Sequence, residues 1–143
     1  MEEGVDFAQL DLELEEGQRF QQLRRLLGVT TFGLNLIVLR PGQVGRIHRH
    51  ERQEEVYLVL EGELSLLLDG EEHRVPTGGL VRVAPEVRRQ LVNRRPQRLA
   101  LLALGGATPH EGRDGVTFAS WEAVEGAPPQ ETPLPPDVPI EAA

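Results

Sequence analysis

Cysteine and lysine are both absent from this chain of 143 residues, and aromatic residues make up only 4% of it. Without cysteine, the chain forms no disulfide and no thiolate metal site, and a cytoplasmic location is favoured. Without lysine, catalysis through a lysine Schiff base or a lysine general base is excluded. Because aromatic residues are so few, the hydrophobic core is expected to consist mainly of leucine and valine.

Long apolar runs are missing as well. No run reaches the roughly 18 apolar residues that a membrane-spanning helix needs. The start Met1-Glu2-Glu3 lacks the positive charge of a signal peptide, which again favours a cytoplasmic location. The net charge of −8 argues against binding to nucleic acid or to an anionic membrane. Neither partner is therefore expected.

The length is that of one domain, and the sequence divides it into three parts. Residues 1–29 are predicted to be an extension with an edge strand over 5–14 and a short helix within 15–27, which carries apolar side chains at helical spacing. Residues 30–124 are predicted to be a barrel with its C-terminal extension. Residues 125–143 are so rich in proline that we expect a flexible tail.

Short β-rich segments with turn residues between them follow one another from residue 30 to residue 104. The clearest is the hairpin at 63–75, where Asp69-Gly70 can supply the positive φ angles of a two-residue turn. No helical segment interrupts the series to make a βαβ unit. The pattern therefore predicts an all-β, antiparallel sandwich or barrel.

The most informative feature is the pair His48 and His50, in a segment that reads as a strand. Side chains alternate between the faces of a strand, so both imidazoles should point the same way. Glu55 follows five residues after His50, where the next predicted strand begins. Two histidines and a carboxylate suit a divalent ion such as Fe, Mn, Ni or Zn. For the histidine pair taken alone, two solvated side chains on an edge strand remain an alternative.

The spacing of Gly42, His48, His50, Glu55 and Gly62 resembles the first sequence motif of the cupins, without gap or mismatch. This resemblance implies an antiparallel β-barrel of the jelly-roll type. It also implies a metal site made of the two histidines, the glutamate and a further histidine from a second motif. Cupins include oxygenases, sugar isomerases, decarboxylases, storage proteins and ligand-sensing domains, so the resemblance predicts no single reaction.

The second cupin motif is matched only in part. In the best register Gly78 and Asn93 are kept, but Arg89 stands where the resemblance implies a metal-binding histidine. A register shifted by one residue would place Gln90 there and lose Asn93. A guanidinium stays protonated and cannot bind a metal. Two interpretations remain open: Arg89 anchors an anionic ligand beside a metal, or it pairs with Glu55 and no metal binds.

Strand parity predicts which other side chains face the inside of the barrel. Arg46 shares the face of His48, Tyr57 shares that of Glu55, and Arg89 joins them in the preferred register. Two arginines beside a divalent cation are costly to bury unless an anion compensates their charge. We therefore predict that a small anionic molecule binds there. Its predicted ligand-binding residues are Arg46, Gln53, Tyr57 and Arg89.

Three functions remain open on this reasoning. The first is a metal-dependent enzyme of the dioxygenase or isomerase type. The second is a ligand-binding or sensing module without turnover, and the third is a metal-free barrel with a role in assembly. A homodimer is predicted, because a small barrel leaves strand edges to pair and residues 5–27 offer apolar surface. His110, in a polar loop, is a further candidate for the mouth of the barrel.

Overall fold

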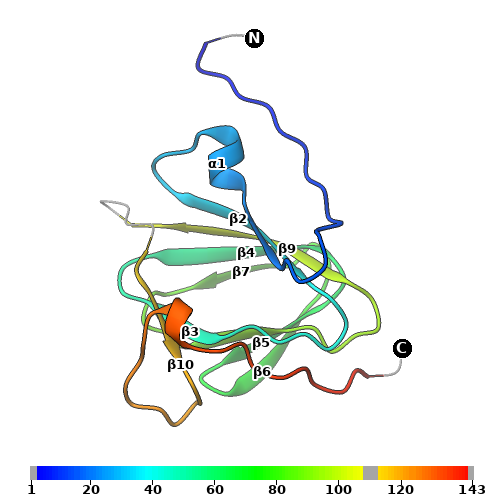
Figure 1. The fold of residues 1–143 in the computed structure, drawn as a ribbon, viewed down its shortest axis with the longest axis vertical. Coiled ribbons are helices and arrows are strands. Elements are labelled where there is room, and N and C mark those ends of the chain that lie inside the picture. The colour runs from blue at the N-terminus through cyan, green and yellow to red at the C-terminus, as the bar shows by residue number, and fades with distance from the viewer. Residues whose placement is uncertain (1–2, 108–112, 142–143) are drawn as a thin grey trace.

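The computed structural model describes residues 3–107 and 113–141 of the chain, and these form two five-stranded antiparallel sheets (Figure 1). The elements in chain order are β1 (Phe20–Gln22), α1 (Leu23–Leu27), β2 (Gly33–Leu39), β3 (Ile47–His50), β4 (Glu54–Glu61), β5 (Leu64–Leu68), β6 (Glu71–Val75), β7 (Leu80–Val83), β8 (Arg89–Val92), β9 (Leu99–Gly106), β10 (Gly115–Phe118) and a 3₁₀ turn at Pro129–Glu131. The first sheet has the order β1-β2-β9-β4-β7 and the second β10-β3-β8-β5-β6. The predicted all-β jelly-roll barrel is confirmed.

Strand β9 shows why both faces of the first sheet are apolar. Leu99, Leu101 and Ala103 point into the core between the two sheets. Ala100 and Leu102 alternate with them and pack in a second cluster, to which Leu12 and Leu14 of the N-terminal segment belong. Since side chains alternate along a strand, a strand covered on both faces needs apolar residues throughout. The N-terminal segment is therefore a cover for the outer face of this sheet.

The glycines of the first motif are required by the backbone. Gly42 and Gly62 have φ angles of 83° and 82°, in the left-handed region that favours glycine. A Cβ atom at Gly42 would lie 2.8 Å from the carbonyl oxygen of Val138, and one at Gly62 would lie 2.5 Å from that of Arg98. Both positions thus combine a left-handed turn with close approach of another backbone segment.

The N-terminal extension differs from its prediction. Residues 5–14 form no strand, and the helix covers only Leu23–Leu27 of the segment 15–27. Residues 20–22 instead form β1, which pairs with the edge of β2. An isolated helix of this length is marginal, whereas pairing with β2 satisfies backbone groups on a sheet that already exists. Gly28, with a φ angle of 73°, ends the helix as predicted.

The proline-rich segment, predicted to be a flexible tail, is hydrogen-bonded to the barrel where the structure describes it. Ala127 pairs with Thr117 of β10, and the N–H of Val138 donates to the carbonyl oxygen of Gly42 at 2.9 Å. The division of the chain into extension, barrel and tail stays a prediction. Within the described residues, none of the helices has the length and apolar character that crossing a membrane requires.

Candidate metal centre and cavity

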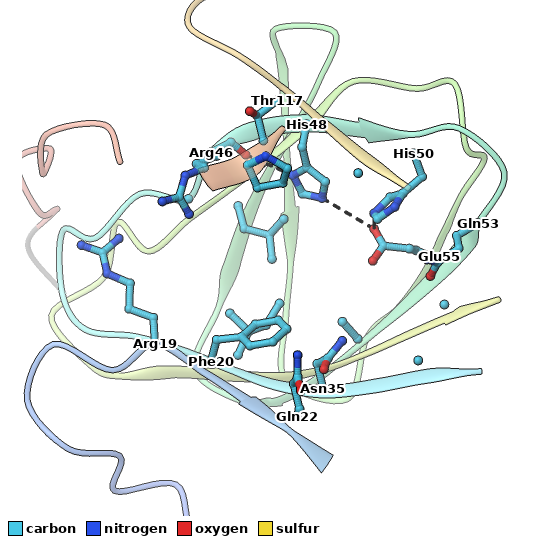
Figure 2. A pocket seen from close by; sticks show the side chains of 18 of the residues that line it. Arg19, Phe20, Gln22, Asn35, Arg46, His48, His50, Gln53, Glu55 and Thr117 are labelled. Atoms are coloured by element: carbon cyan, nitrogen blue, oxygen red, sulfur yellow. Dashed lines mark hydrogen bonds and ion pairs between the residues drawn. The ribbon is translucent and has the colours of Figure 1, made fainter. Parts of the chain in front are cut away.

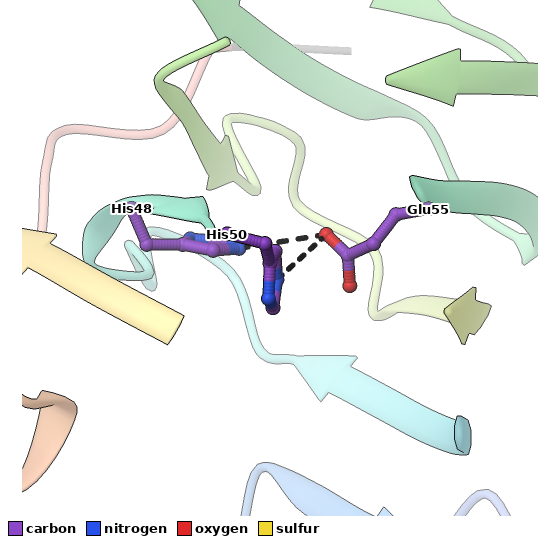
Figure 3. Close-up of side chains that lie close together, drawn as sticks. All are labelled: His48, His50 and Glu55. Atoms are coloured by element: carbon purple, nitrogen blue, oxygen red, sulfur yellow. Dashed lines mark ion pairs between the residues drawn. The ribbon is translucent and has the colours of Figure 1, made fainter. Parts of the chain in front are cut away.

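The predicted metal ligands come together from two strands that lie in different sheets. His48 and His50 are on β3 of the second sheet, and Glu55 is on β4 of the first (Figure 3). One ligand atom from each of the three lies within 4.8 Å of the others. Glu55 Oε1 lies 3.7 Å from Nε2 of His48 and 3.3 Å from Nε2 of His50. The histidine rings meet edge to face, with centroids 5.4 Å apart.

The outer nitrogen of each histidine is held by a hydrogen-bond acceptor. Nδ1 of His48 lies 3.1 Å from the carbonyl oxygen of Arg46, and Nδ1 of His50 lies 2.8 Å from Oδ1 of Asp114. With a metal ion bound, Nδ1 of each ring would carry the proton and Nε2 would offer its lone pair to the ion beside Glu55. Nε2 of His50 is buried and has no hydrogen-bond partner among the described residues. Metal-binding histidines usually have this arrangement, so the donor set fits a metal ion.

Asp114 is a site residue that sequence reasoning missed. Besides His50, its carboxylate accepts hydrogen bonds from the backbone N–H groups of Arg52 and Gln53 and from Nε2 of Gln53, at 2.7–2.8 Å. Burial alone would raise the pKa of Asp114, but His50 and the two backbone N–H groups outweigh it and lower the pKa. Asp114 thus remains ionised and fixes the ring of His50.

Arg89 lies inside the barrel, beside Glu55. It is fully buried, and its Nη2 donates to Glu55 Oε1 at 3.0 Å. Its Nη1 donates to the carbonyl oxygens of Val87 at 2.6 Å and Pro85 at 3.2 Å. Arg89 is not among the residues that line the cavity. Of the two interpretations, the pairing with Glu55 is the one that the structure contains, yet Glu55 still faces both histidines.

Tyr57 and the two histidines determine the charge of Glu55. The hydroxyl of Tyr57 donates to Glu55 Oε1 at 2.7 Å. Burial would raise the pKa of Glu55, but the contacts with His48 and His50 outweigh it and hold the pKa well below its usual value. Burial and the Glu55 charge raise the pKa of Tyr57 well above its usual value. Burial would lower the pKa of His50, but Glu55 and Asp114 raise it. At neutral pH the site therefore offers a carboxylate and a neutral phenol.

The three candidate ligands lie on the wall of a cavity of about 890 Å³ (Figure 2). Of the predicted ligand-binding residues, Arg46, Gln53 and Tyr57 line it. Other parts of its wall come from segments that the sequence did not connect with the site. These wall residues include Arg19, Phe20 and Gln22 of the N-terminal segment, Asn35 of β2, and Pro128, Pro129, Gln130 and Leu134 of the C-terminal segment. His110 lies outside the described residues.

Residues 35–105, from β2 into β9, match the family model described as a cupin domain. A sugar phosphate isomerase of the cupin superfamily from Silicibacter pomeroyi has a similar structure, with 29% identity, a TM-score of 0.59 and coverage of 81% of this chain and 79% of that chain. A cupin 2 conserved barrel domain protein from Salinispora arenicola is 24% identical, with a TM-score of 0.60 and coverage of 71% and 88%. A cupin protein from Bacteroides fragilis is 21% identical, with a TM-score of 0.59 and coverage of 80% and 94%. No curated protein matches the chain in sequence.

Proposed function

Since residues 35–105 of this chain are a cupin domain, we propose that it binds a divalent metal ion and holds a small anionic molecule in the cavity beside that ion. His48, His50 and Glu55 would hold the ion. The observation that carries this proposal is the orientation of the histidines, whose Nδ1 atoms are both bonded to acceptors while the buried Nε2 of His50 has no hydrogen-bond partner among the described residues.

The surrounding residues hold the candidate ligands in the position and protonation state that a cation requires. Arg89 and Tyr57 hold Glu55 in one position, and Glu55 remains ionised at neutral pH. Asp114 holds His50 in the tautomer that a metal needs. A divalent ion there would act as a Lewis acid on an oxygen atom of a bound ligand. Since the protein supplies three ligand groups, coordination positions stay open for such an oxygen.

The similarity to the isomerase from Silicibacter pomeroyi supports a sugar phosphate as the anionic molecule and an isomerisation as the reaction. Binding without turnover is favoured by a different observation. The Tyr57 hydroxyl is buried and already donates to Glu55, and Glu55 Oε1 accepts hydrogen bonds from both Tyr57 and Arg89. Neither is then suited to exchange a proton with a substrate near neutral pH. Incubation of the metal-loaded protein with fructose 6-phosphate, followed by chromatography of the sugar phosphates, separates the two functions.

Metal binding is tested by removing metal with a chelator and titrating Fe(II), Mn(II), Ni(II) and Zn(II) separately. We expect one ion per chain for at least one of these metals. The double variant His48→Ala/His50→Ala should lose the ion and keep its circular dichroism spectrum. Asp114→Ala should bind the ion roughly 10- to 100-fold more weakly, because the ring of His50 loses its support.

His73→Ala is the matched control, because His73 is an exposed histidine of β6 that does not belong to the cluster. It should bind metal like the wild type. Absence of stoichiometric binding for all four metals would contradict the proposal. Equal binding by the double variant would place the ion elsewhere.

A further inference from the structure

The cavity has a second charged end, built from two segments that are far apart in the sequence. Arg19 lies directly before β1 and Arg46 directly before β3, and both line the cavity. Figure 2 shows their guanidinium groups on one side of the cavity and His50 and Glu55 on the other. The two arginines are close enough to affect each other: burial first, and then the charges of Arg46 and Arg40, lower the pKa of Arg19 against the opposing effect of Asp137.

Main-chain acceptors hold both guanidinium groups in place. Nε of Arg46 donates to the carbonyl oxygen of Thr132 at 2.7 Å, and Nη1 of Arg19 donates to that of Val44 at 3.0 Å. Both acceptors are neutral and leave the charge of the arginines in place. Nη1 and Nη2 of Arg46 have no partner among the described residues, and therefore keep donors for a ligand. An arginine already fixed in position loses less conformational entropy when it binds one.

Among the residues that the structure describes, no carboxylate lines this end of the cavity. The charged side chains that line the cavity, besides the two histidines, are Arg19, Arg24, Arg46, Arg113 and Glu55. Glu55 is already paired with Arg89. Asp137 approaches Arg19 only to 4.0 Å and its side chain is 62% exposed. Among the described residues Arg46 forms no ion pair and Arg19 has only this long, exposed one, so their positive charge favours the binding of an anion.

The wall also carries two amide side chains. Gln22 of β1 and Asn35 of β2 are directly opposite each other in the strand pairing, and both line the cavity. Figure 2 shows them on the first sheet, across the cavity from His48. Amide groups donate and accept hydrogen bonds, which suits the hydroxyl groups of a polyol. The volume of about 890 Å³ is within the roughly 300–1,000 Å³ typical of small-molecule sites.

We propose that Arg19 and Arg46 bind the phosphate group of a small phosphorylated sugar or polyol, whose hydroxyl oxygens point toward His48, His50 and Glu55. A phosphate monoester carries between one and two negative charges near neutral pH, enough to compensate two guanidinium groups. Its three terminal oxygens accept the paired donors of both arginines. The metal end of this arrangement rests on the proposed function, whereas the phosphate end depends only on the arginines.

Calorimetric titration of the metal-loaded and the metal-free protein tests the inference. The probes are fructose 6-phosphate, fructose, gluconate and inorganic phosphate. For the metal-loaded wild type, we expect fructose 6-phosphate to bind at least about tenfold more tightly than fructose or gluconate. Arg19→Gln and Arg46→Gln should each lower the affinity for fructose 6-phosphate roughly 10- to 100-fold and leave the affinity for fructose unchanged. Arg25→Gln, an exposed arginine of α1 outside the cavity, is the matched control and should bind like the wild type.

The metal-free protein separates this inference from the proposed function. One outcome is that no metal binds, that inorganic phosphate binds the wild type, and that both arginine variants lose this phosphate binding. The inference about the arginines would then be supported and the proposed metal site contradicted. If metal binds and both folded variants bind fructose 6-phosphate like the wild type, the inference is overturned. Tighter binding of gluconate than of the phosphate ester would overturn the choice of phosphate. If none of the four probes binds the wild type, the proposed phosphate site at Arg19 and Arg46 is contradicted.

Discussion

Arg89 stands where the cupin resemblance implies a metal-binding histidine, and its cationic side chain pairs with Glu55. Its guanidinium is fully buried and bonded to Glu55 Oε1, and the Nε2 atoms of His48 and His50 lie 3.7 Å and 3.3 Å from the same oxygen. A carboxylate that shares its charge with an arginine attracts a metal ion less strongly than an unpaired one. The site therefore combines three ligand groups with a reduced negative charge. We expect a metal affinity that is sensitive to this one residue.

Arg89→His should tighten metal binding by at least about tenfold, or about 1.4 kcal/mol. The imidazole adds a ligand, and the cation beside the metal disappears. The affinity for inorganic phosphate should not change, because Arg89 does not line the cavity. The loss of the buried pair should lower the free energy of unfolding of the metal-free protein by up to about 3–5 kcal/mol. Metal titration, phosphate titration and urea unfolding measure the three effects.

The neighbouring variant Arg88→His is the control. Arg88 stacks on Phe118, with its guanidinium carbon 3.6 Å from the ring centroid, and is not among the cavity-lining residues. A histidine there should not tighten metal binding. A wild-type metal affinity in Arg89→His would mean that position 89 does not face the metal centre.

Local spacing was enough to predict part of the site. His48, His50 and Glu55 are close in sequence, and strand parity places the histidines on one face. Asp114 escaped prediction because it contacts His50 across a separation of 64 residues, with no local pattern to connect them. Arg19 was missed because its segment was interpreted as part of a helix. For Arg89, the sequence left two partners open, an anionic ligand or Glu55. The choice depended on Glu55 and Tyr57, which belong to another strand of the barrel.

At the scale of the elements, turn chemistry was the most reliable guide. Asp69 and Gly70 have φ angles of 50° and 86°, as the predicted two-residue turn requires. Strand pairing was not predictable in the same way, because β2 pairs with β9, which lies far away along the chain: Leu39 pairs with Leu99, and Gly33 with Gly105. The helix was predicted too long because residues 15–27 have helical periodicity, but the free edge of β2 provides hydrogen bonds for residues 20–22.

Gly62, the last glycine of the first motif, can be compared with Gly78 to test what Gly62 contributes to stability. Their φ angles are 82° and 84°, but a Cβ atom would lie 2.5 Å from the carbonyl oxygen of Arg98 at Gly62 and would meet no atom within 4 Å at Gly78. Gly78→Ala should cost only the left-handed strain of about 1–2 kcal/mol. Gly62→Ala should cost roughly 1–3 kcal/mol more, because overpacking adds to that strain.

Urea unfolding of both variants, followed by circular dichroism, gives the difference. An equal loss of stability in the two variants would show that the backbone at Arg98 moves away at little cost. In that case the motif glycine would be required only for its φ angle.

At the scale of the whole molecule, a negative net charge is combined with a positively charged cavity wall. The chain has a net charge of −8, yet within the described part of the chain four arginines and one glutamate line the cavity. The net charge is a sum over the whole chain, so it cannot reveal a local cluster of positive side chains. Arg19 and Arg24 belong to the N-terminal segment, whereas Arg46 lies between β2 and β3 and Arg113 lies between β9 and β10. Of these four arginines, Arg46 alone belongs to the part of the chain that matches the cupin domain.

The N-terminal segment also carries the last prediction, a homodimer. The start of this segment extends away from the barrel (Figure 1), and its apolar residues Val5, Phe7 and Leu10 are exposed to 42%, 79% and 39%. Apolar side chains of this size, gathered on one arm, favour burial against a second copy of the chain. We expect a dimer by light scattering at micromolar concentration. Phe7→Ser/Leu10→Ser should shift it toward monomer, whereas Val124→Ser, at a separate position with 89% exposure, should not. A monomeric wild type would show that the arm does not bind a second copy.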